Sequence, residues 1–134
     1  HSIHDVLYSM YNMKLTPFES TMLSGWELVH NKGQLTLWIM VAIRQKKEFA
    51  EDILVFIKES ADLDPEGQSL YRSLRRLEKS TLVQSQKVAS PGGPDKKRFT
   101  LTAAGKNVLD AFIERNINRI IIQGYKDGLF DLER

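Results

Sequence analysis

One stretch of the chain decides its fold. Residues 66–106 read EGQSLYRSLRRLEKSTLVQSQKVASPGGPDKKRFTLTAAGK. They hold nine Lys and Arg against three Asp and Glu, a net charge of +6, whereas residues 1–65 carry −3 and residues 107–134 carry −1. Because the whole chain has a net charge of only +2, this basic island is hidden in the overall composition. A patterned basic island indicates a surface for a polyanionic partner.

The first part of the island predicts an amphipathic helix over 65–79. Asp64, Pro65 and Glu66 form a helix start, with a capping acid, a proline in the first turn and a carboxylate at the positive end of the helix dipole. At helical spacing one face carries Leu70, Leu74 and Leu77, and the opposite face carries Gln68, Arg72, Arg75 and Lys79. An ordinary solvated surface would explain such a face by itself, so its meaning depends on the segment that follows.

The second part of the island predicts a β-hairpin. Residues 82–88 and 97–102 are predicted strands, in which Leu82, and later Phe99 and Leu101, alternate with polar residues, and the turn-forming residues 90–95 lie between them. A basic helix followed at once by such a hairpin is the order of a winged helix-turn-helix. In that fold the helix enters the major groove of duplex DNA, where Arg and Gln can read guanine and adenine, and the wing contacts phosphates.

Three helices are predicted before the island. The first begins with the capping box Thr16-Pro17-Phe18-Glu19 and ends at Asn31-Lys32-Gly33. The second covers about 34–45, and the third follows a charged turn and covers about 48–60. We expect four aromatic side chains of these helices to lie in the core: Trp26, Trp38, Phe49 and Phe56.

The last predicted helix is capped by Thr102 and reaches about Tyr125. Its apolar surface is wider than a small winged domain can cover, so we expect it to pair with a second copy of the chain. The residues predicted at this dimer interface are Leu109, Ile113, Ile117, Ile120 and Ile121. Packing against the first helix of the same chain remains the alternative. We therefore expect the chain to have two parts. Residues 1–106 form a winged helix-turn-helix domain with an N-terminal helical extension, and residues 107–134 form a dimerisation helix and tail.

The composition argues against several other classes of protein. There is no Cys, and the three His (1, 4 and 30) have no matching carboxylate spacing, so we predict neither an enzyme nor a bound metal or cofactor. The longest apolar stretch, 35–43, is less than half of the roughly 20 residues that a membrane helix needs. The first residues also lack a secretion signal pattern. We therefore expect a cytoplasmic protein without membrane contact.

The same island resembles the PadR family of bacterial transcriptional regulators. The resemblance lies in QSLYRSLRRLEK at 68–79, LV at 82–83 and RFTLTAAGK at 98–106. Two segments depart from the family pattern. They are Ala50-Glu51, before the island, and Ser80-Thr81, where the helix usually ends in a Gly-containing segment. The resemblance implies a homodimeric repressor whose C-terminal helices form the dimer. In some members it also implies an aromatic effector bound between subunits.

The sequence therefore predicts a mainly α-helical winged helix-turn-helix protein with N-terminal and C-terminal dimerisation helices. We expect a sequence-specific transcriptional regulator, a repressor, with helix 65–79 in the major groove and wing 89–98 on phosphates. The predicted DNA-contacting residues are Gln68, Ser69, Tyr71, Arg72, Arg75, Arg76, Lys79, Lys96, Lys97 and Arg98. The predicted partners are double-stranded DNA, a second copy of the chain and a small aromatic effector. A MarR-like regulator and a winged-helix module for protein contacts remain alternatives.

Overall fold

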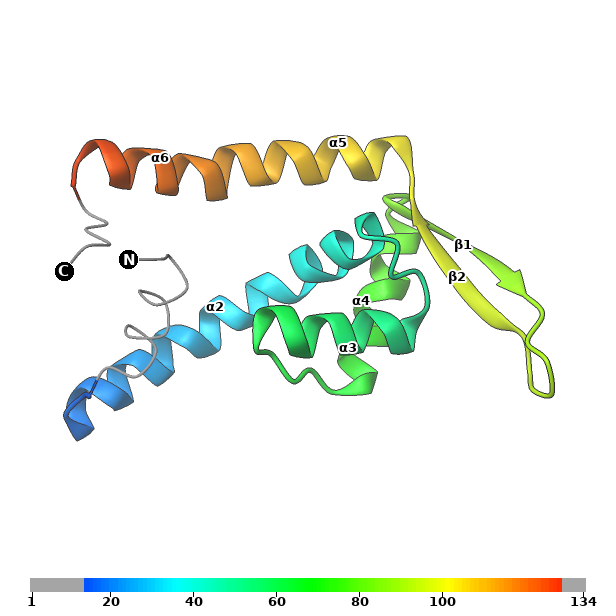
Figure 1. Cartoon of the computed structure of the whole chain (residues 1–134), viewed down its shortest axis with the longest axis horizontal. Helices are drawn as coiled ribbons and strands as arrows, with labels where there is room; N and C mark the ends of the chain where they lie inside the picture. Colours follow the sequence, from blue (N-terminus) through cyan, green and yellow to red (C-terminus); the bar gives the residue numbers. More distant parts are fainter. Residues whose placement is uncertain (1–13, 129–134) are drawn as a thin grey trace. The chain divides into compact units, whose positions relative to one another are not determined.

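The computed structural model describes residues 14–128. Within this range the chain is mainly helical and has one two-stranded hairpin (Figure 1). The elements are α2 (Pro17–Arg44), α3 (Ala50–Ala61), α4 (Gly67–Lys79), β1 (Val83–Val88), β2 (Lys96–Leu101), α5 (Ala103–Phe112), the π-helix η1 (Ile113–Asn118) and α6 (Arg119–Lys126). This order confirms the predicted fold class. Across the described residues, no helix is long and apolar enough to cross a membrane.

The chain divides into two compact units. One consists of Val29–Ala111, and the other of the segments before and after it. The buried apolar side chains of the described residues all belong to the first unit. They are Ile39, Met40, Ala42 and Ile43 of α2, Ile53 and Ile57 of α3, Leu70, Leu74 and Leu77 of α4, Val83 and Phe99 of the hairpin, and Leu109 of α5. The predicted leucine face of α4 is thus confirmed as its core face.

Helix α2 begins as predicted and ends later than predicted. In the capping box, the Thr16 amide donates to Glu19 Oε1 at 2.8 Å and the Glu19 amide donates to Thr16 Oγ1 at 3.1 Å. The Thr16 hydrogen bonds hold the pKa of Glu19 below its ordinary value. The predicted break at residues 31–33 is wrong, because α2 continues without interruption to Arg44. Gly33 weakens a helix by only about 1 kcal/mol relative to Ala and removes no backbone hydrogen bond, so it does not end the helix.

Two of the four aromatic side chains expected in the core pack beside each other. Trp38 and Phe56 are half-buried, with ring centroids 6.3 Å apart. Phe49 is also half-buried. Trp26 is 74% exposed, so its predicted core position is wrong. The core is built from Val29 onward, and Trp26 precedes it on α2.

The start of α4 differs from the predicted helix start, whereas the predicted hairpin is confirmed. The helix begins at Gly67, and its N-cap residue Glu66 makes no side-chain capping bond. Asp64, the predicted cap, instead forms an ion pair with Lys58 at 3.4 Å. The hairpin strands are antiparallel with Val83 opposite Leu101 and Val88 opposite Lys96.

The C-terminal region is not one uninterrupted α-helix. Thr102 does cap α5, since its Oγ1 accepts the Gly105 amide at 3.0 Å. After α5 the chain forms six residues of π-helix before α6 begins. A π-helix bonds residue i to i+5, so the residues beyond η1 do not keep the α-helical register that the prediction assumed.

Candidate nucleic-acid interface

The outward face of α4 carries the basic residues that the sequence predicted. Because three leucines of α4 are buried in the core, the opposite side of the helix must face outward. The predicted contact residues on this helix are exposed at Gln68, Tyr71, Arg72, Arg75, Arg76 and Lys79, and half-buried at Ser69. Within residues 14–128, none of the four cations of this face forms an ion pair. Their positive charge is therefore available to a partner.

The end of α4 leads the chain directly into the wing. Thr81 has a φ of 61°, in the left-handed region, and the Leu82 amide donates to the Leu77 carbonyl at 3.1 Å. This six-residue closure is the Schellman motif that ends many helices. The hairpin starts two residues after Thr81, so little freedom is left between the helix and the wing.

Three further contacts hold the base of the wing. The Ser85 hydroxyl donates to Glu78 of α4 at 2.6 Å. On the other strand, the Phe99 amide donates to the Glu48 carbonyl just before α3, at 2.8 Å. Thr102 then ties β2 to the end of α4, because its hydroxyl donates to the Thr81 carbonyl at 2.7 Å. The wing is therefore fixed to α3, α4 and the start of α5.

Two of the three predicted wing cations are already paired with acids. Lys96 Nζ lies 2.7 Å from Glu51 Oε1, and this hydrogen bond raises the pKa of Lys96 above its ordinary value. Arg98 Nε lies 3.8 Å from Glu48 Oε1, and its guanidinium lies over the Phe49 ring, 5.7 Å from the centroid. Lys97 has no ion pair within residues 14–128. The three consecutive cations are thus not equivalent.

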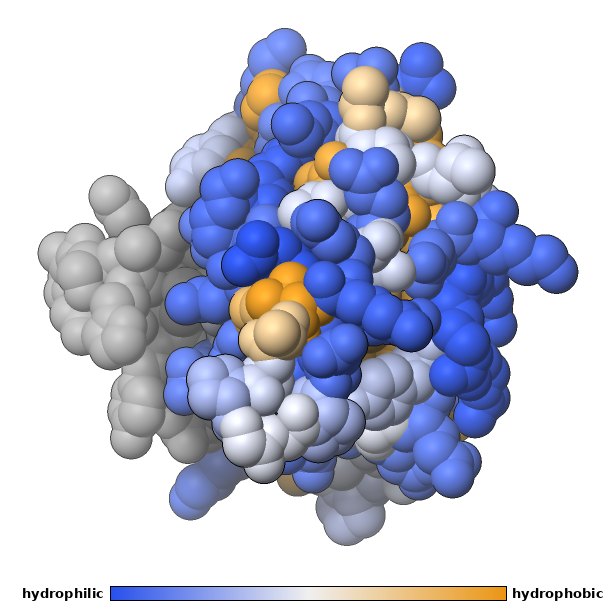
Figure 2. All heavy atoms as spheres, turned by 90° about the vertical axis from the view of Figure 1, so that its right-hand side faces the viewer, coloured by the Kyte–Doolittle hydropathy of each residue, from blue (hydrophilic) through white to orange (hydrophobic). Residues whose placement is uncertain are grey.

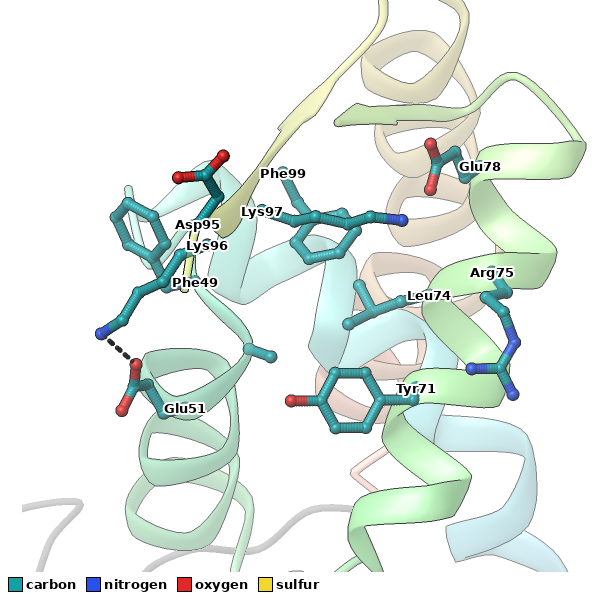
Figure 3. Close-up of a pocket in the computed structure, with 11 residues that line it drawn as sticks. Phe49, Glu51, Tyr71, Leu74, Arg75, Glu78, Asp95, Lys96, Lys97 and Phe99 are labelled. Carbon is teal, nitrogen blue, oxygen red and sulfur yellow. Dashed lines mark hydrogen bonds and ion pairs between the residues drawn. The ribbon is translucent and has the colours of Figure 1, made fainter. Parts of the chain in front are cut away.

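A cleft of about 470 Å³ separates α4 from the wing and the start of α3 (Figure 3). Apolar side chains of Phe49, Leu74 and Phe99 line it, together with the ring of Tyr71. In Figure 3 the Lys97 side chain extends from β2 toward α4. Figure 2, which views the molecule from the side on the right of Figure 1, shows a largely hydrophilic surface with a small hydrophobic area near its middle. The cleft is also lined by charged side chains of both signs: Glu51, Glu78, Asp95, Arg75, Lys96 and Lys97.

The residues predicted for dimerisation differ in exposure. Leu109 is 1% exposed and belongs to the core, so we leave it out of the proposed interface. Ile113 and Ile117 of η1 are half-buried, whereas Ile120 and Ile121 of α6 are exposed. Sequence reasoning passed over two neighbours, Ile122 and Tyr125, which are also exposed. Both could have been predicted from the sequence, because their spacing places them on the same face of a helix.

Sequence reasoning also missed three residues beside the wing. Glu48 and Glu51 were not predicted to take part in the site, because nothing local shows that they lie next to β2. Lys87 was counted in the basic island but not as a contact residue. Its position opposite Lys97 follows once the hairpin register is known. Among the described residues there is no group of three or more His, Cys, Asp or Glu that could hold a metal ion.

The fold and this surface can be compared with known proteins. The sequence pattern of the transcriptional regulator PadR-like family matches residues 39–111, more than half of the chain. The chain belongs to this family. The match spans the whole of α3, α4, the wing and most of α5, which are the elements that form the proposed interface. A search of curated proteins found no match.

Solved structures of transcriptional regulators, several of them named as PadR proteins, have the same fold. A PadR-like transcription factor from Bacteroides fragilis is 28% identical, with a TM-score of 0.61 over 74% of this chain and 97% of that chain. A Streptococcus transcriptional regulator is 27% identical, with a TM-score of 0.58 over 71% and 94%. Bacillus subtilis PadR in complex with operator DNA is 19% identical, with a TM-score of 0.57 over 72% and 59%. At that identity the last comparison supports the fold alone.

Proposed function

We propose that this PadR-like protein is a sequence-specific DNA-binding transcriptional regulator that acts as a homodimeric repressor. The observation that carries the proposal is the outward face of α4, where four exposed cations without acidic partners in the described range stand beside a fixed wing. Helix α4 enters the major groove, and the wing contacts the sugar-phosphate backbone. Bacillus subtilis PadR, a protein of the same fold, is in complex with operator DNA in its solved structure, which supports duplex DNA as the ligand.

Repression follows from the proposed assembly. Two copies place two recognition helices on successive major grooves, so the operator should contain two half-sites about one helical turn apart. A dimer bound across a promoter blocks access to it. We also propose that the protein acts by binding rather than catalysis, since its family consists of transcriptional regulators. A small aromatic effector stays a prediction from the family resemblance.

The alternative of a winged-helix module for protein contacts predicts a different surface. Such a module would carry acidic or apolar residues on the outward face of α4 and a neutral wing. The outward face here includes Arg72, Arg75 and Lys79, all exposed. This charge distribution favours DNA over a protein partner.

The proposal is tested by measuring binding to duplex DNA at different salt concentrations. If the dimer neutralises about six phosphates, affinity should fall roughly a thousandfold between 50 and 200 mM salt. Selection of bound sequences from random DNA should then yield a palindrome with the expected half-site spacing. A flat salt response, or no binding at low salt, would show that the protein does not use this surface for DNA.

A further inference from the structure

Two lysines face each other across the wing. In the hairpin register, Lys87 of β1 lies directly opposite Lys97 of β2. Both side chains are exposed, and neither has an acidic partner within residues 14–128. Opposite residues in an antiparallel pair have Cβ atoms only about 4.5–5.5 Å apart, and like charges at such positions destabilise the hairpin. An anion bound between the two ammonium groups would remove this repulsion.

The pair lies on the face of the hairpin that is turned toward α4. Side chains alternate between the two faces of a strand, so Lys87 shares its face with Ser85, and Lys97 shares its face with Phe99. Ser85 hydrogen-bonds to Glu78 of α4, and Phe99 is buried. Lys97 also lines the cleft beside α4, together with Arg75 and the acidic side chains of Glu78 and Asp95 (Figure 3). The lysine pair therefore borders the same surface as the outward residues of the recognition helix.

The neighbouring cations of β2 have a different role. Lys96 is bound to Glu51, Arg98 lies beside Glu48 and Phe49, and the backbone of β2 donates from Phe99 to the Glu48 carbonyl. Residues 48–51 thus contact β2 at three of four consecutive positions. The one β2 residue of these four that they do not contact is Lys97. Its neighbours on both sides are held by residues 48–51, so Lys97 lies on a fixed part of the strand.

We propose that Lys87 and Lys97 together bind a phosphate group of the DNA backbone where it passes between α4 and the wing. In the same proposal, Lys96 and Arg98 position the wing and contribute little to the phosphate contacts. This inference rests on the proposed function, because its ligand is duplex DNA. It assigns a contact to Lys87, which the basic composition alone did not single out, and it divides the wing cations by role.

Lysine on a hairpin edge has another known effect, since it discourages pairing with the edge of another sheet. That effect acts on the folded protein alone and does not depend on DNA. It predicts that replacing Lys87 promotes self-association and leaves the salt dependence of DNA binding unchanged. The two explanations therefore give different results in a binding experiment.

The experiment measures the affinity of the full chain for a duplex of arbitrary sequence by fluorescence anisotropy at several salt concentrations. An arbitrary duplex suffices because phosphate contacts do not depend on sequence. Because the two lysines bind one phosphate, we expect the double change Lys87→Gln with Lys97→Gln to reduce the slope of log affinity against log salt by about 0.9 per protomer, and each single change to reduce it by part of that amount. Lys87→Arg and Lys97→Arg should retain the wild-type slope.

Two controls separate this site from general charge effects. Lys106→Gln removes one lysine of the same basic island, but Lys106 lines a different cleft with Gln84 and Thr100, on the opposite face of the hairpin. Its slope should equal that of the wild type. The double change Lys96→Gln with Glu51→Gln removes a paired positive and negative charge together. It should lower affinity by the same factor at every salt concentration, because it loosens the wing without removing a phosphate contact.

A second measurement concerns the free protein. If the two lysines repel each other, Lys87→Gln should raise the thermal midpoint at low salt. The increase should vanish near 1 M salt, where the Debye length is only about 3 Å and charges farther apart than that are screened. Slopes for Lys87→Gln and Lys97→Gln that match the Lys106→Gln slope would overturn the inference, provided that the wild type still binds DNA. Failure of the wild type to bind would instead overturn the proposed function.

Discussion

At Gly105, α5 lies directly against the backbone of Leu82 at the base of the wing. A Cβ atom at this position would collide with the carbonyl oxygen of Leu82, and the carbonyl carbon would lie only 3.0 Å away. That carbonyl also accepts the Thr102 amide at 3.1 Å. Because the obstacle is backbone, it cannot move aside as a flexible side chain could. We predict that Gly105→Ala lowers the free energy of unfolding by about 3 kcal/mol, measured by urea denaturation.

Gly33 provides a matched control for Gly105. It also lies within a helix, and an added Cβ atom there would meet no atom within 4 Å. Gly33→Ala should therefore raise the free energy of unfolding by about 0.5–1 kcal/mol, because alanine restricts the unfolded chain and favours helix. Equal effects of the two substitutions would mean that the close approach of α5 to Leu82 is not a constraint on the fold.

Residue types alone did not indicate how α4 ends. The family pattern has a Gly-containing segment there, whereas this chain has Ser80-Thr81, and a β-branched residue rarely adopts positive φ. Thr81 nevertheless has a φ of 61°. Its carbonyl accepts the Thr102 hydroxyl, and the following amide closes the helix end. The bond between Thr102 and Thr81 joins residues 21 positions apart, so no local pattern could have predicted that it would help to outweigh the backbone preference of threonine.

At the scale of elements, α4 and the wing should contribute differently to DNA binding. Arg72 and Arg75 project from the outward face of the helix, where arginine can donate two hydrogen bonds to guanine. We predict that Arg72→Ala or Arg75→Ala costs about 1–3 kcal/mol at the selected operator and relaxes the sequence preference. Binding of each variant to the operator and to an arbitrary duplex measures both effects.

Lys97→Ala is the matched comparison from the wing. It should weaken binding to the operator and to the arbitrary duplex by the same factor, because a phosphate contact carries no sequence information. If Lys97→Ala altered base preference while the arginine substitutions did not, the roles of helix and wing would be reversed.

Elements with strong periodicity were predictable, and their interruptions were not. The leucine spacing of α4 identified its buried face, and the turn residues at 90–95 identified the hairpin, because each signal is local and repeated. The unbroken course of α2 was missed because the asparagine, lysine and glycine at 31–33 are tolerated inside a helix as well as after one. The π-helix at Ile113–Asn118 has no sequence signal that we recognise.

The same limit applies to the candidate site. The basic residues of α4 were predictable because they share one helix face. The pairing of Lys96 with Glu51 was not, since it joins residues 45 positions apart and depends on how β2 packs beside α3. Charge counting therefore identified the segment that carries the proposed interface but treated paired and unpaired cations alike.

At the scale of the whole molecule, exposed apolar residues concentrate outside the Val29–Ala111 unit. On α6 they are Ile120, Ile121, Ile122 and Tyr125, and on the first half of α2 they include Phe18 and Trp26. Exposed apolar surface of this extent indicates an interaction site. A second copy of the chain is the partner that a two-half-site operator requires, which is why the proposed dimer interface lies on η1 and α6.

We therefore predict that Ile117→Glu combined with Ile120→Glu converts the dimer to a monomer. The change places charges in a surface that must lose its water on association, which is costly when the charges have no partner. The winged domain should still fold, because its buried side chains all precede residue 112. Sedimentation should show the loss of the dimer. Titration should show that the preference for a palindrome over a single half-site is lost, since each half-site alone supplies only part of the binding free energy.

Arg115→Gln combined with Arg119→Gln is the control, because it changes the net charge by the same amount at neighbouring polar positions of the same segment. This variant should sediment as the wild type does. If the isoleucine variant also sediments as a dimer and retains the preference for a palindrome, the interface lies on another surface. The exposed residues of α2, with Phe18 and Trp26, would then be the next to replace, since they are the other apolar surface outside the winged domain.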